Sequence, residues 1–63
     1  MDIGESIKLL RKKHGFTGKQ LAELSGVTRA TIGHIERGRH KPSIDTVELL
    51  LQPFGLRLTI KEK

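Results

Sequence analysis

The sequence predicts a small all-α domain of four to five short helices, followed by a single C-terminal β-strand. Successive segments each begin at a helix-capping residue, carry apolar residues at helical spacing and end at a glycine or a proline. The last segment instead alternates between apolar and polar residues, which is typical of a half-buried strand. Because the chain has only 63 residues, we expect residues 1–63 to form a single folding unit.

The composition excludes several classes of site. The chain contains no cysteine, so it can form neither a disulfide nor a cysteine-ligated zinc site. No two of its histidines have the spacing of metal ligands, and we expect no metal or other cofactor. The longest apolar run, Leu49–Leu51, is too short to cross a membrane, and Met1-Asp2 does not begin a signal peptide. A cytoplasmic protein without a membrane partner is therefore expected.

The first helix is expected to begin at Asp2 and to end at His14-Gly15. Asp2 and Glu5 have the spacing of a capping box, in which each side chain bonds to the backbone N–H of the other residue. The apolar residues that follow at helical spacing are Ile3, Ile7 and Leu10.

Two more short helices are expected at Thr17–Ser25 and Thr28–Arg37. Each begins at a capping threonine, and Gln20 can complete a capping box with Thr17. The apolar positions of these helices are Leu21, Ala22, Leu24, Ile32 and Ile35. Only Gly26-Val27 joins the two helices. This tight connection is typical of a helix-turn-helix, whose second helix enters the major groove of DNA.

A fourth helix is expected after Pro42-Ser43. Its apolar residues on one face are Ile44, Val47, Leu50, Leu51 and Phe54. Pro53 cannot donate a backbone hydrogen bond and should bend or end this helix. Beyond it, Leu56, Leu58 and Ile60 alternate with polar residues, so a strand is expected at about residues 56–61. No second segment has this pattern, and the strand therefore has no partner within the chain.

The net charge of +5 is unevenly distributed along the chain. Lys8–Lys19 contains five basic residues and no acid, and Arg29–Lys41 contains four basic residues against Glu36 alone. Pro42–Gly55 contains only two charged residues, both of them acidic. A basic half and an acidic half suggest that one face meets a polyanion, although a solvated basic surface without a partner would have the same composition.

The residues around the tight turn resemble those of the Cro/C1 or XRE family, the helix-turn-helix type of the lambda and 434 repressors. The shared pattern is Phe16-Thr17-x-x-x-Leu21-Ala22-x-x-Ser25-Gly26-Val27-Thr28-x-x-x-Ile32-x-x-Ile35-Glu36-x-Gly38, followed by Pro42-Ser43-Ile44-Asp45-Thr46. The resemblance covers about residues 3–55 and implies a compact, lambda-repressor-like bundle. The tail Leu51–Ile60 resembles the HipB-like antitoxin branch, in which a strand follows the fourth helix.

The resemblance implies that the third helix contacts the base edges of double-stranded DNA. By position, the residues that would do so are Thr28, Arg29, Ala30 and His34. Arg29 can donate two hydrogen bonds to guanine, and Ala30 offers only a methyl contact. His34 can donate or accept a hydrogen bond, depending on its tautomer. The alternatives are an exposed helix charge at Arg29 and a solvent-facing residue at His34.

Phosphate contacts are expected from basic and hydroxyl residues around the third helix: Lys19, Thr31, Arg37, Arg39 and Lys41. Lys19 lies in the first turn of its helix, where free N–H groups also favour an anion. The family usually has glutamine directly after the capping threonine, where this chain has Gly18. The glycine removes a contact to phosphate or to an outer base, so recognition should depend more on the third helix.

The resemblance also implies an ion pair between the first and third helices, formed by Arg11 and Glu36. Such a pair fixes the orientation of the third helix more than it adds to stability. The alternative is that these are two unrelated surface charges.

The unpaired strand predicts a homodimer. Two copies paired across a two-fold axis would satisfy each other's backbone and bury Leu56, Leu58 and Ile60 together with Phe54. Such a dimer can place two recognition helices one turn of DNA apart and bind an inverted-repeat operator. The alternative is a frayed tail on a monomer.

The expected function is sequence-specific transcriptional repression at a palindromic operator. The HipB-like tail favours an autoregulating antitoxin with a toxin partner, such as a HipA-like kinase; the alternative is a stand-alone XRE-type regulator. Catalysis is not expected, because so short a chain lacks a cleft of useful size. RNA binding is disfavoured because the only aromatic residues, Phe16 and Phe54, are at core positions.

Overall fold

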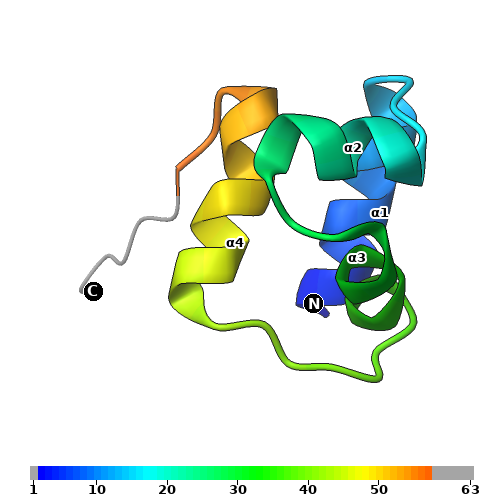
Figure 1. Cartoon of the computed structure of the whole chain (residues 1–63), viewed down its shortest axis with the longest axis vertical. Coiled ribbons are helices and arrows are strands. Elements are labelled where there is room, and N and C mark those ends of the chain that lie inside the picture. Colours follow the sequence, from blue (N-terminus) through cyan, green and yellow to red (C-terminus); the bar gives the residue numbers. More distant parts are fainter. Residues whose placement is uncertain (1, 58–63) are drawn as a thin grey trace.

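The computed structural model describes residues 2–57, which form four α-helices and one short 3₁₀ helix (Figure 1). The elements are α1 (Ile3–Lys13), α2 (Gly18–Ser25), α3 (Arg29–Glu36), α4 (Ile44–Leu51) and the 3₁₀ helix η1 (Gln52–Phe54). The prediction of an all-helical bundle of four to five short helices is confirmed. Over this part of the chain, no helix is both long enough and apolar enough to span a membrane.

Side-chain caps fix where the helices begin. The Oγ1 atom of Thr17 accepts the N–H of Gln20 at 3.1 Å, and Gln20 Oε1 accepts the N–H of Thr17 at 2.8 Å. This is the capping box predicted for α2. Thr28 and Ser43 begin α3 and α4 in the same way, each accepting the N–H three residues further on at 3.2 Å.

The capping box predicted for α1 is not formed. Asp2 does cap the helix, but its Oδ1 atom accepts the N–H of Gly4 at 3.0 Å rather than that of Glu5. The hydroxyl of Ser6 donates to the carbonyl oxygen of Asp2 at 3.1 Å. The carboxylate of Asp2 therefore accepts the N–H two residues further on, whereas in a capping box it would accept the N–H three residues further on. Glu5 takes no part in the cap.

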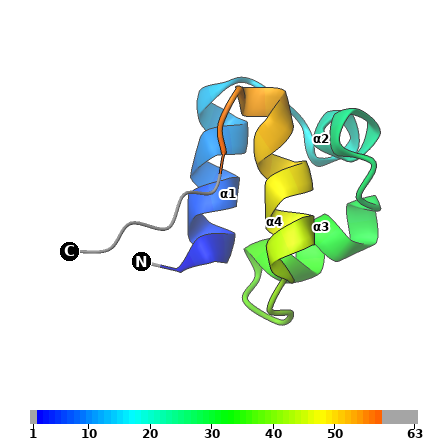
Figure 2. The same ribbon diagram turned by 90° about the vertical axis from the view of Figure 1, so that its left-hand side faces the viewer.

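The apolar faces of the four helices meet in one core. Its buried members are Ile7, Leu21, Val27, Ile32, Ile35, Val47, Leu50 and Leu51. In Figures 1 and 2, α4 lies on one side of the bundle, and α1, α2 and α3 lie on the other side. Three residues at predicted apolar positions are exposed instead: Ile3, Leu24 and Ile44. So small a chain buries only part of its apolar surface, and helices of eight residues have too few neighbours to cover a wide face.

The crossing of α1 and α3 depends on Gly4. This residue is buried, and a Cβ atom placed on it would clash with the carbonyl oxygen of Ile35. Only glycine therefore allows the two backbones to come this close without a shift. Nearer the C-terminal end of α1, Arg11 pairs with Glu36, the residue that follows Ile35 in α3.

The fourth helix ends as Pro53 predicts. The α-helical part stops at Leu51, and the chain continues as η1 until Gly55, which has a left-handed φ of +72°. The ring of Phe54 lies 5.7 Å from that of Phe16, between ring centroids. This contact joins η1 to the loop that precedes α2.

The predicted strand is not seen in the part of it that the structure describes. Leu56 and Arg57 have no regular secondary structure, and Leu56 is exposed. The other residues of the predicted strand, including Leu58 and Ile60, lie outside the described residues. A strand is defined by its hydrogen-bonded neighbour, and the only neighbour predicted for this one belongs to a second chain.

Candidate nucleic-acid interface

Local hydrogen bonds fix the turn between α2 and α3. Gly26 has a left-handed φ of +78°, and its N–H donates to the carbonyl oxygen of Ala22 at 3.0 Å. The buried hydroxyl of Ser25 accepts the N–H of Val27 at 3.1 Å. Val27 is itself part of the core, so the turn packs against the body of the domain. The tight connection predicted from Gly26-Val27 is confirmed.

The third helix is buried on one side and exposed on the other. Ile32 and Ile35 are each 1% exposed and anchor the helix to the core. The residues predicted to contact bases are all exposed: Thr28, Arg29, Ala30 and His34. The helix therefore presents an accessible surface that carries one guanidinium, one methyl group and one imidazole. Its opposite side is anchored by Ile32 and Ile35.

The two threonines at the start of α3 have different roles. Thr28 Oγ1 accepts the N–H of Thr31 at 3.2 Å and donates its proton to Thr31 Oγ1 at 2.7 Å. The hydroxyl of Thr28 is thus occupied within the chain, and the proton of the Thr31 hydroxyl remains available. Thr31 can donate to a ligand, whereas Thr28 offers mainly its methyl group.

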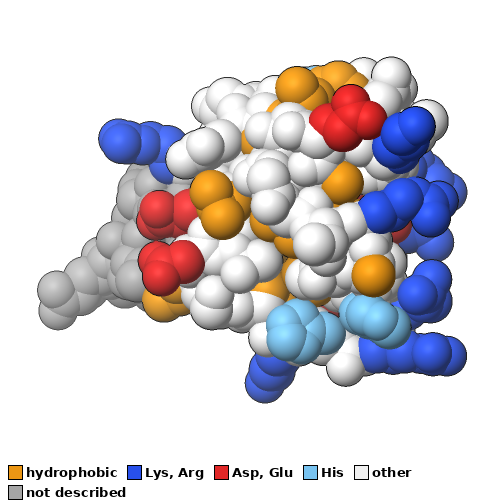
Figure 3. Space-filling view, in the orientation of Figure 1, with side chains coloured by type: hydrophobic (Ala, Val, Ile, Leu, Met, Phe, Trp, Pro, Cys, Tyr) orange, Lys and Arg blue, Asp and Glu red, His pale blue; other side chains and the backbone are white. Residues whose placement is uncertain are grey.

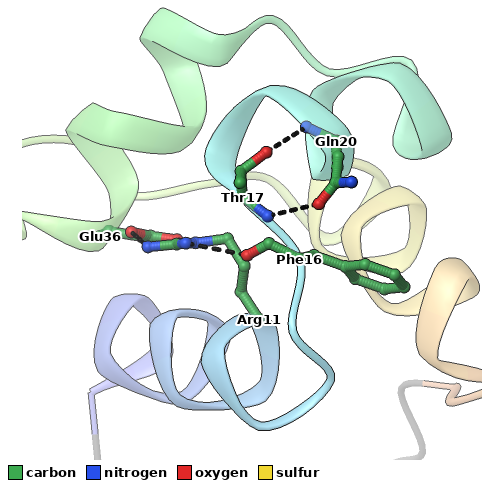
Figure 4. Close-up of polar contacts among 5 residues, drawn as sticks. All are labelled: Arg11, Phe16, Thr17, Gln20 and Glu36. Atoms are coloured by element: carbon green, nitrogen blue, oxygen red, sulfur yellow. Dashed lines mark hydrogen bonds and ion pairs between the residues drawn. The ribbon is translucent and has the colours of Figure 1, made fainter.

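The side chain of Arg11 connects α1 with α3 and with the loop that precedes α2 (Figure 4). Its Nε donates to Glu36 Oε2 at 2.8 Å and its Nη2 donates to Glu36 Oε1 at 3.0 Å. Its Nη1 donates to the carbonyl oxygen of Phe16 at 3.0 Å. The hydrogen bond to Glu36 raises the pKa of Arg11 above its ordinary value; burial opposes this effect, and the negative charge of Glu36 adds to it. Arg11 and Glu36 are therefore in contact as an ion pair. Both carboxylate oxygens of Glu36 accept a hydrogen bond from Arg11.

Basic side chains surround the exposed side of α3. Those predicted to contact phosphate are exposed: Lys19, Arg37, Arg39 and Lys41; Thr31 is half-buried. The N–H of Arg39 donates to the carbonyl oxygen of His34 at 2.9 Å, which keeps the start of the following loop beside α3. In Figure 3, Lys and Arg side chains gather on the side formed by α1, α2 and α3, and acidic side chains lie over α4 and also over α2, beside the basic ones.

Two glycines lie directly beneath arginine side chains, an arrangement that the sequence does not predict. A Cβ atom on Gly18 would lie 3.6 Å from Arg29 Nε, and one on Gly33 would lie 3.2 Å from Arg37 Nη2. All four residues line a groove that is open to solvent between the start of α2 and the exposed side of α3. The only signal in the sequence was the unusual presence of glycine at both positions.

The exposed groups around α3 suit an anion rather than a cation. Within residues 2–57, no three His, Asp or Glu side chains gather closely enough to hold a metal ion. The groups present are guanidinium, ammonium, imidazole and hydroxyl. All of these can donate hydrogen bonds to phosphates and to base edges.

The residues predicted to form a dimer interface are only partly described. Leu56 is 45% exposed, whereas Phe54 is half-buried and packs within its own chain against His14 and Phe16. Leu58 and Ile60 lie outside the described residues.

The chain belongs to the helix-turn-helix family. The family model described as "Helix-turn-helix" matches residues 7–61, which include all four predicted base-contacting positions. The resemblance to the XRE family is confirmed by this match.

Several regulators from bacteria and phages are similar to this chain. The immunity repressor protein of Bacillus phage phi105 is 36% identical over 94% of this chain. The competence pilus inhibition repressor of Acinetobacter baylyi is 37% identical over 87% of it, and the antitoxin PezA of Streptococcus pneumoniae is 32% identical over 86%. The chain spans 41%, 50% and 34% of the lengths of these three relatives, respectively. No solved structure matches the chain.

Proposed function

We propose that this chain is a sequence-specific DNA-binding transcriptional repressor that inserts α3 into the major groove. The observation that carries the proposal is the two-sided character of α3. Ile32 and Ile35 anchor one side, while Arg29 and its neighbours remain exposed on the other side. A helix placed in this way can approach base edges without any loss of its own packing.

Direct contacts to bases are assigned to Arg29, Ala30 and His34, with Thr28 contributing its methyl group. Arg29 suits a guanine and Ala30 suits the methyl group of a thymine. Lys19, Thr31, Arg39 and Lys41 surround this surface and are assigned to phosphates, which fix the register of the protein on the duplex. Arg37 is not included in the second group because its guanidinium lies over Gly33.

The ion pair between Arg11 and Glu36 is assigned a positioning role. It joins the end of α1 to the end of α3 and also bonds to the loop that precedes α2. Since α3 has only eight residues, a small rotation would move every base-contacting side chain. The pair opposes such a rotation.

We further propose that the repressor works as a homodimer on an inverted repeat and that residues 1–63 suffice for binding. The alternating pattern of Leu56, Leu58 and Ile60 supports an intersubunit β-ribbon. A dimer would place two copies of α3 about 34–36 Å apart, so that both enter the major groove on one side of the duplex.

An autoregulating antitoxin is the more specific form of this proposal. The HipB-like tail and the relative named antitoxin PezA support it, and a HipA-like kinase is the partner that the tail suggests. The alternative is a stand-alone regulator, in keeping with the relatives named as repressors. Co-purification from the native host separates the two. An antitoxin should co-purify with a second protein in a stoichiometric amount, and the gene of that protein should lie next to its own. A stand-alone regulator should be recovered without a second protein.

Fluorescence anisotropy with labelled duplexes tests DNA binding itself. The full chain should bind duplex DNA enriched from a random pool at least a hundredfold more tightly than a scrambled duplex of the same length. The logarithm of the affinity should fall linearly with the logarithm of the salt concentration. Equal affinity for both duplexes, or tighter binding to the matching RNA duplex, would contradict the proposal.

A further inference from the structure

Arg37 occupies the space that a side chain at residue 33 would fill. A Cβ atom on Gly33 would lie 3.2 Å from Nη2, 3.5 Å from Nη1 and 3.6 Å from Cζ of Arg37. Side chains on a helix lean toward its N-terminus, so Arg37 reaches back by one turn. Its backbone forms the C-terminal cap of α3, but its charged group lies level with the middle of the helix.

Helical geometry places this group on the same face as a predicted base contact. Arg37 follows Gly33 by four residues and Ala30 by seven, and at 3.6 residues per turn these three positions share one side of a helix. Arg29, Ala30, Gly33 and Arg37 also line the same solvent-exposed groove. The guanidinium of Arg37 is therefore on the face of α3 that carries Ala30, and not at its flank.

The donors of Arg37 are available to a ligand. Among residues 2–57, no hydrogen bond or ion pair engages the Arg37 side chain, and the side chain is exposed. Its neighbour Glu36 does not neutralise it, because both carboxylate oxygens of Glu36 accept hydrogen bonds from Arg11.

We propose that Arg37 is a second specificity-determining residue, which contacts a guanine in the major groove, and that Gly33 is the residue that permits this contact. The inference rests on the proposed DNA-binding function. A guanidinium can donate two hydrogen bonds to O6 and N7 of guanine. That guanine lies in the same half-site as the base pair contacted by Arg29, since both side chains belong to one helix. A Cβ atom at residue 33 would force the guanidinium to shift by a few tenths of an ångström, which is enough to disturb a contact that depends on two aligned hydrogen bonds.

Binding-site selection from a randomised DNA duplex pool tests the inference with the full chain and three variants. Arg37→Lys keeps the charge but loses the planar fork of donors. Gly33→Ala places a methyl group against the guanidinium and favours the helix. Arg57→Lys is the matched control, because it makes the same chemical change at an exposed residue outside α3 that is not assigned a DNA contact. Circular dichroism confirms folding, and Gly33→Ala should melt at the wild-type temperature or above it.

The wild-type chain should enrich a motif that contains a fixed G·C pair in each half-site. Arg37→Lys and Gly33→Ala should both lose selectivity at that pair, by about tenfold or more, while Arg57→Lys returns the wild-type motif. Uniformly weaker binding by Arg37→Lys with an unchanged motif would make Arg37 a phosphate contact and overturn the inference. Loss of selectivity in Arg37→Lys alone would overturn the role of Gly33. If the wild-type chain enriches no motif, the proposed function itself fails.

Discussion

Arg11 donates two parallel hydrogen bonds to Glu36, from Nε to Oε2 at 2.8 Å and from Nη2 to Oε1 at 3.0 Å. The side chains are 16% and 11% exposed, respectively, so the pair is largely removed from water. The remaining donor, Nη1, bonds to the carbonyl oxygen of Phe16. One guanidinium thus holds together α1, the end of α3 and the loop between α1 and α2. Its removal should affect both folding and the orientation of α3.

A double-mutant cycle measures this coupling. Arg11→Met leaves the carboxylate of Glu36 and the carbonyl of Phe16 without a partner, so it should lower the free energy of unfolding by about 3 kcal/mol. Glu36→Leu should lower the free energy of unfolding by less than Arg11→Met does, because Arg11 keeps its hydrogen bond to Phe16. The double variant should be more stable than the sum of the two single losses predicts, by about 1–3 kcal/mol. Urea unfolding followed by circular dichroism gives all three values.

Lys12→Met is the matched control for this cycle, because Lys12 is exposed on the same turn of α1. It should change stability by less than about 0.5 kcal/mol. While Glu36 is ionised, the raised pKa of Arg11 means that the contribution of the pair is complete below the ordinary arginine value and is lost as the pH rises through the raised value. Equal and additive losses for the two single variants would contradict a coupled pair.

Gly4→Ala should destabilise the fold although alanine favours a helix. The new Cβ would clash with the carbonyl oxygen of Ile35, so α1 or α3 must shift. The expected loss is about 1–3 kcal/mol, net of the gain in helix propensity. Thermal melting of the purified variant measures it.

Gly18→Ala is the control for this substitution. It also replaces a helical glycine, but its Cβ would make an ordinary contact with Arg29 at 3.6 Å. This variant should be as stable as the wild type, or more stable by up to about 1 kcal/mol. If both variants gain stability, the close crossing at Gly4 has no energetic importance.

Arg29 and Arg39 should have separable effects on DNA binding. Arg29→Ala should cost about 1–3 kcal/mol on the selected duplex and relax discrimination at one base pair. Arg39→Ala should weaken binding to all duplexes alike and reduce the slope of the salt dependence by about one unit. Anisotropy titrations on the selected duplex and on single-base variants of it distinguish these outcomes. An unchanged base preference in Arg29→Ala would remove Arg29 from the base-contacting set.

The sequence predicted the features of the fold that depend on neighbouring residues. Three of the four predicted caps use the expected donor and acceptor three residues apart, and Pro53 ends α4 where its missing N–H requires. These features are local, and a few consecutive residues contain all the information needed. Arg11 and Glu36 are far apart in sequence, and their pairing came from the family resemblance rather than from any pattern in the residues.

Features that depend on the distance between helices were not predictable in this way. Apolar periodicity identifies the face that includes Ile44 and Leu24, but not whether another helix reaches it, and both residues are exposed. The clash that makes Gly4 necessary depends on the position of Ile35, in a different helix. The guanidinium of Arg37 lies over Gly33 because the Arg37 side chain points back along the helix. The spacing of residues in the sequence does not determine that direction.

The last prediction concerns the C-terminal segment, where alternating residues predict a strand that pairs across a dimer. Sedimentation equilibrium should find the full chain as a dimer at concentrations where a chain ending at Gly55 is a monomer. Leu58→Lys would put a charge on the face predicted to be buried, and it should also give monomers. Thr59→Lys is the matched control, because the alternation places this residue on the opposite face, where a charge is tolerated.

The same variants connect the dimer to DNA binding. A dimer with two linked copies of α3 should bind an inverted repeat at least a hundredfold more tightly than a single half-site, because the second contact becomes intramolecular. The shortened chain and Leu58→Lys should lose most of this advantage while keeping the affinity of the wild-type chain for a single half-site. Thr59→Lys should keep the full advantage. If the shortened chain dimerises as tightly as the full chain, the interface lies elsewhere, and the exposed side chains of α4, such as Ile44 and Leu49, become the next surface to substitute.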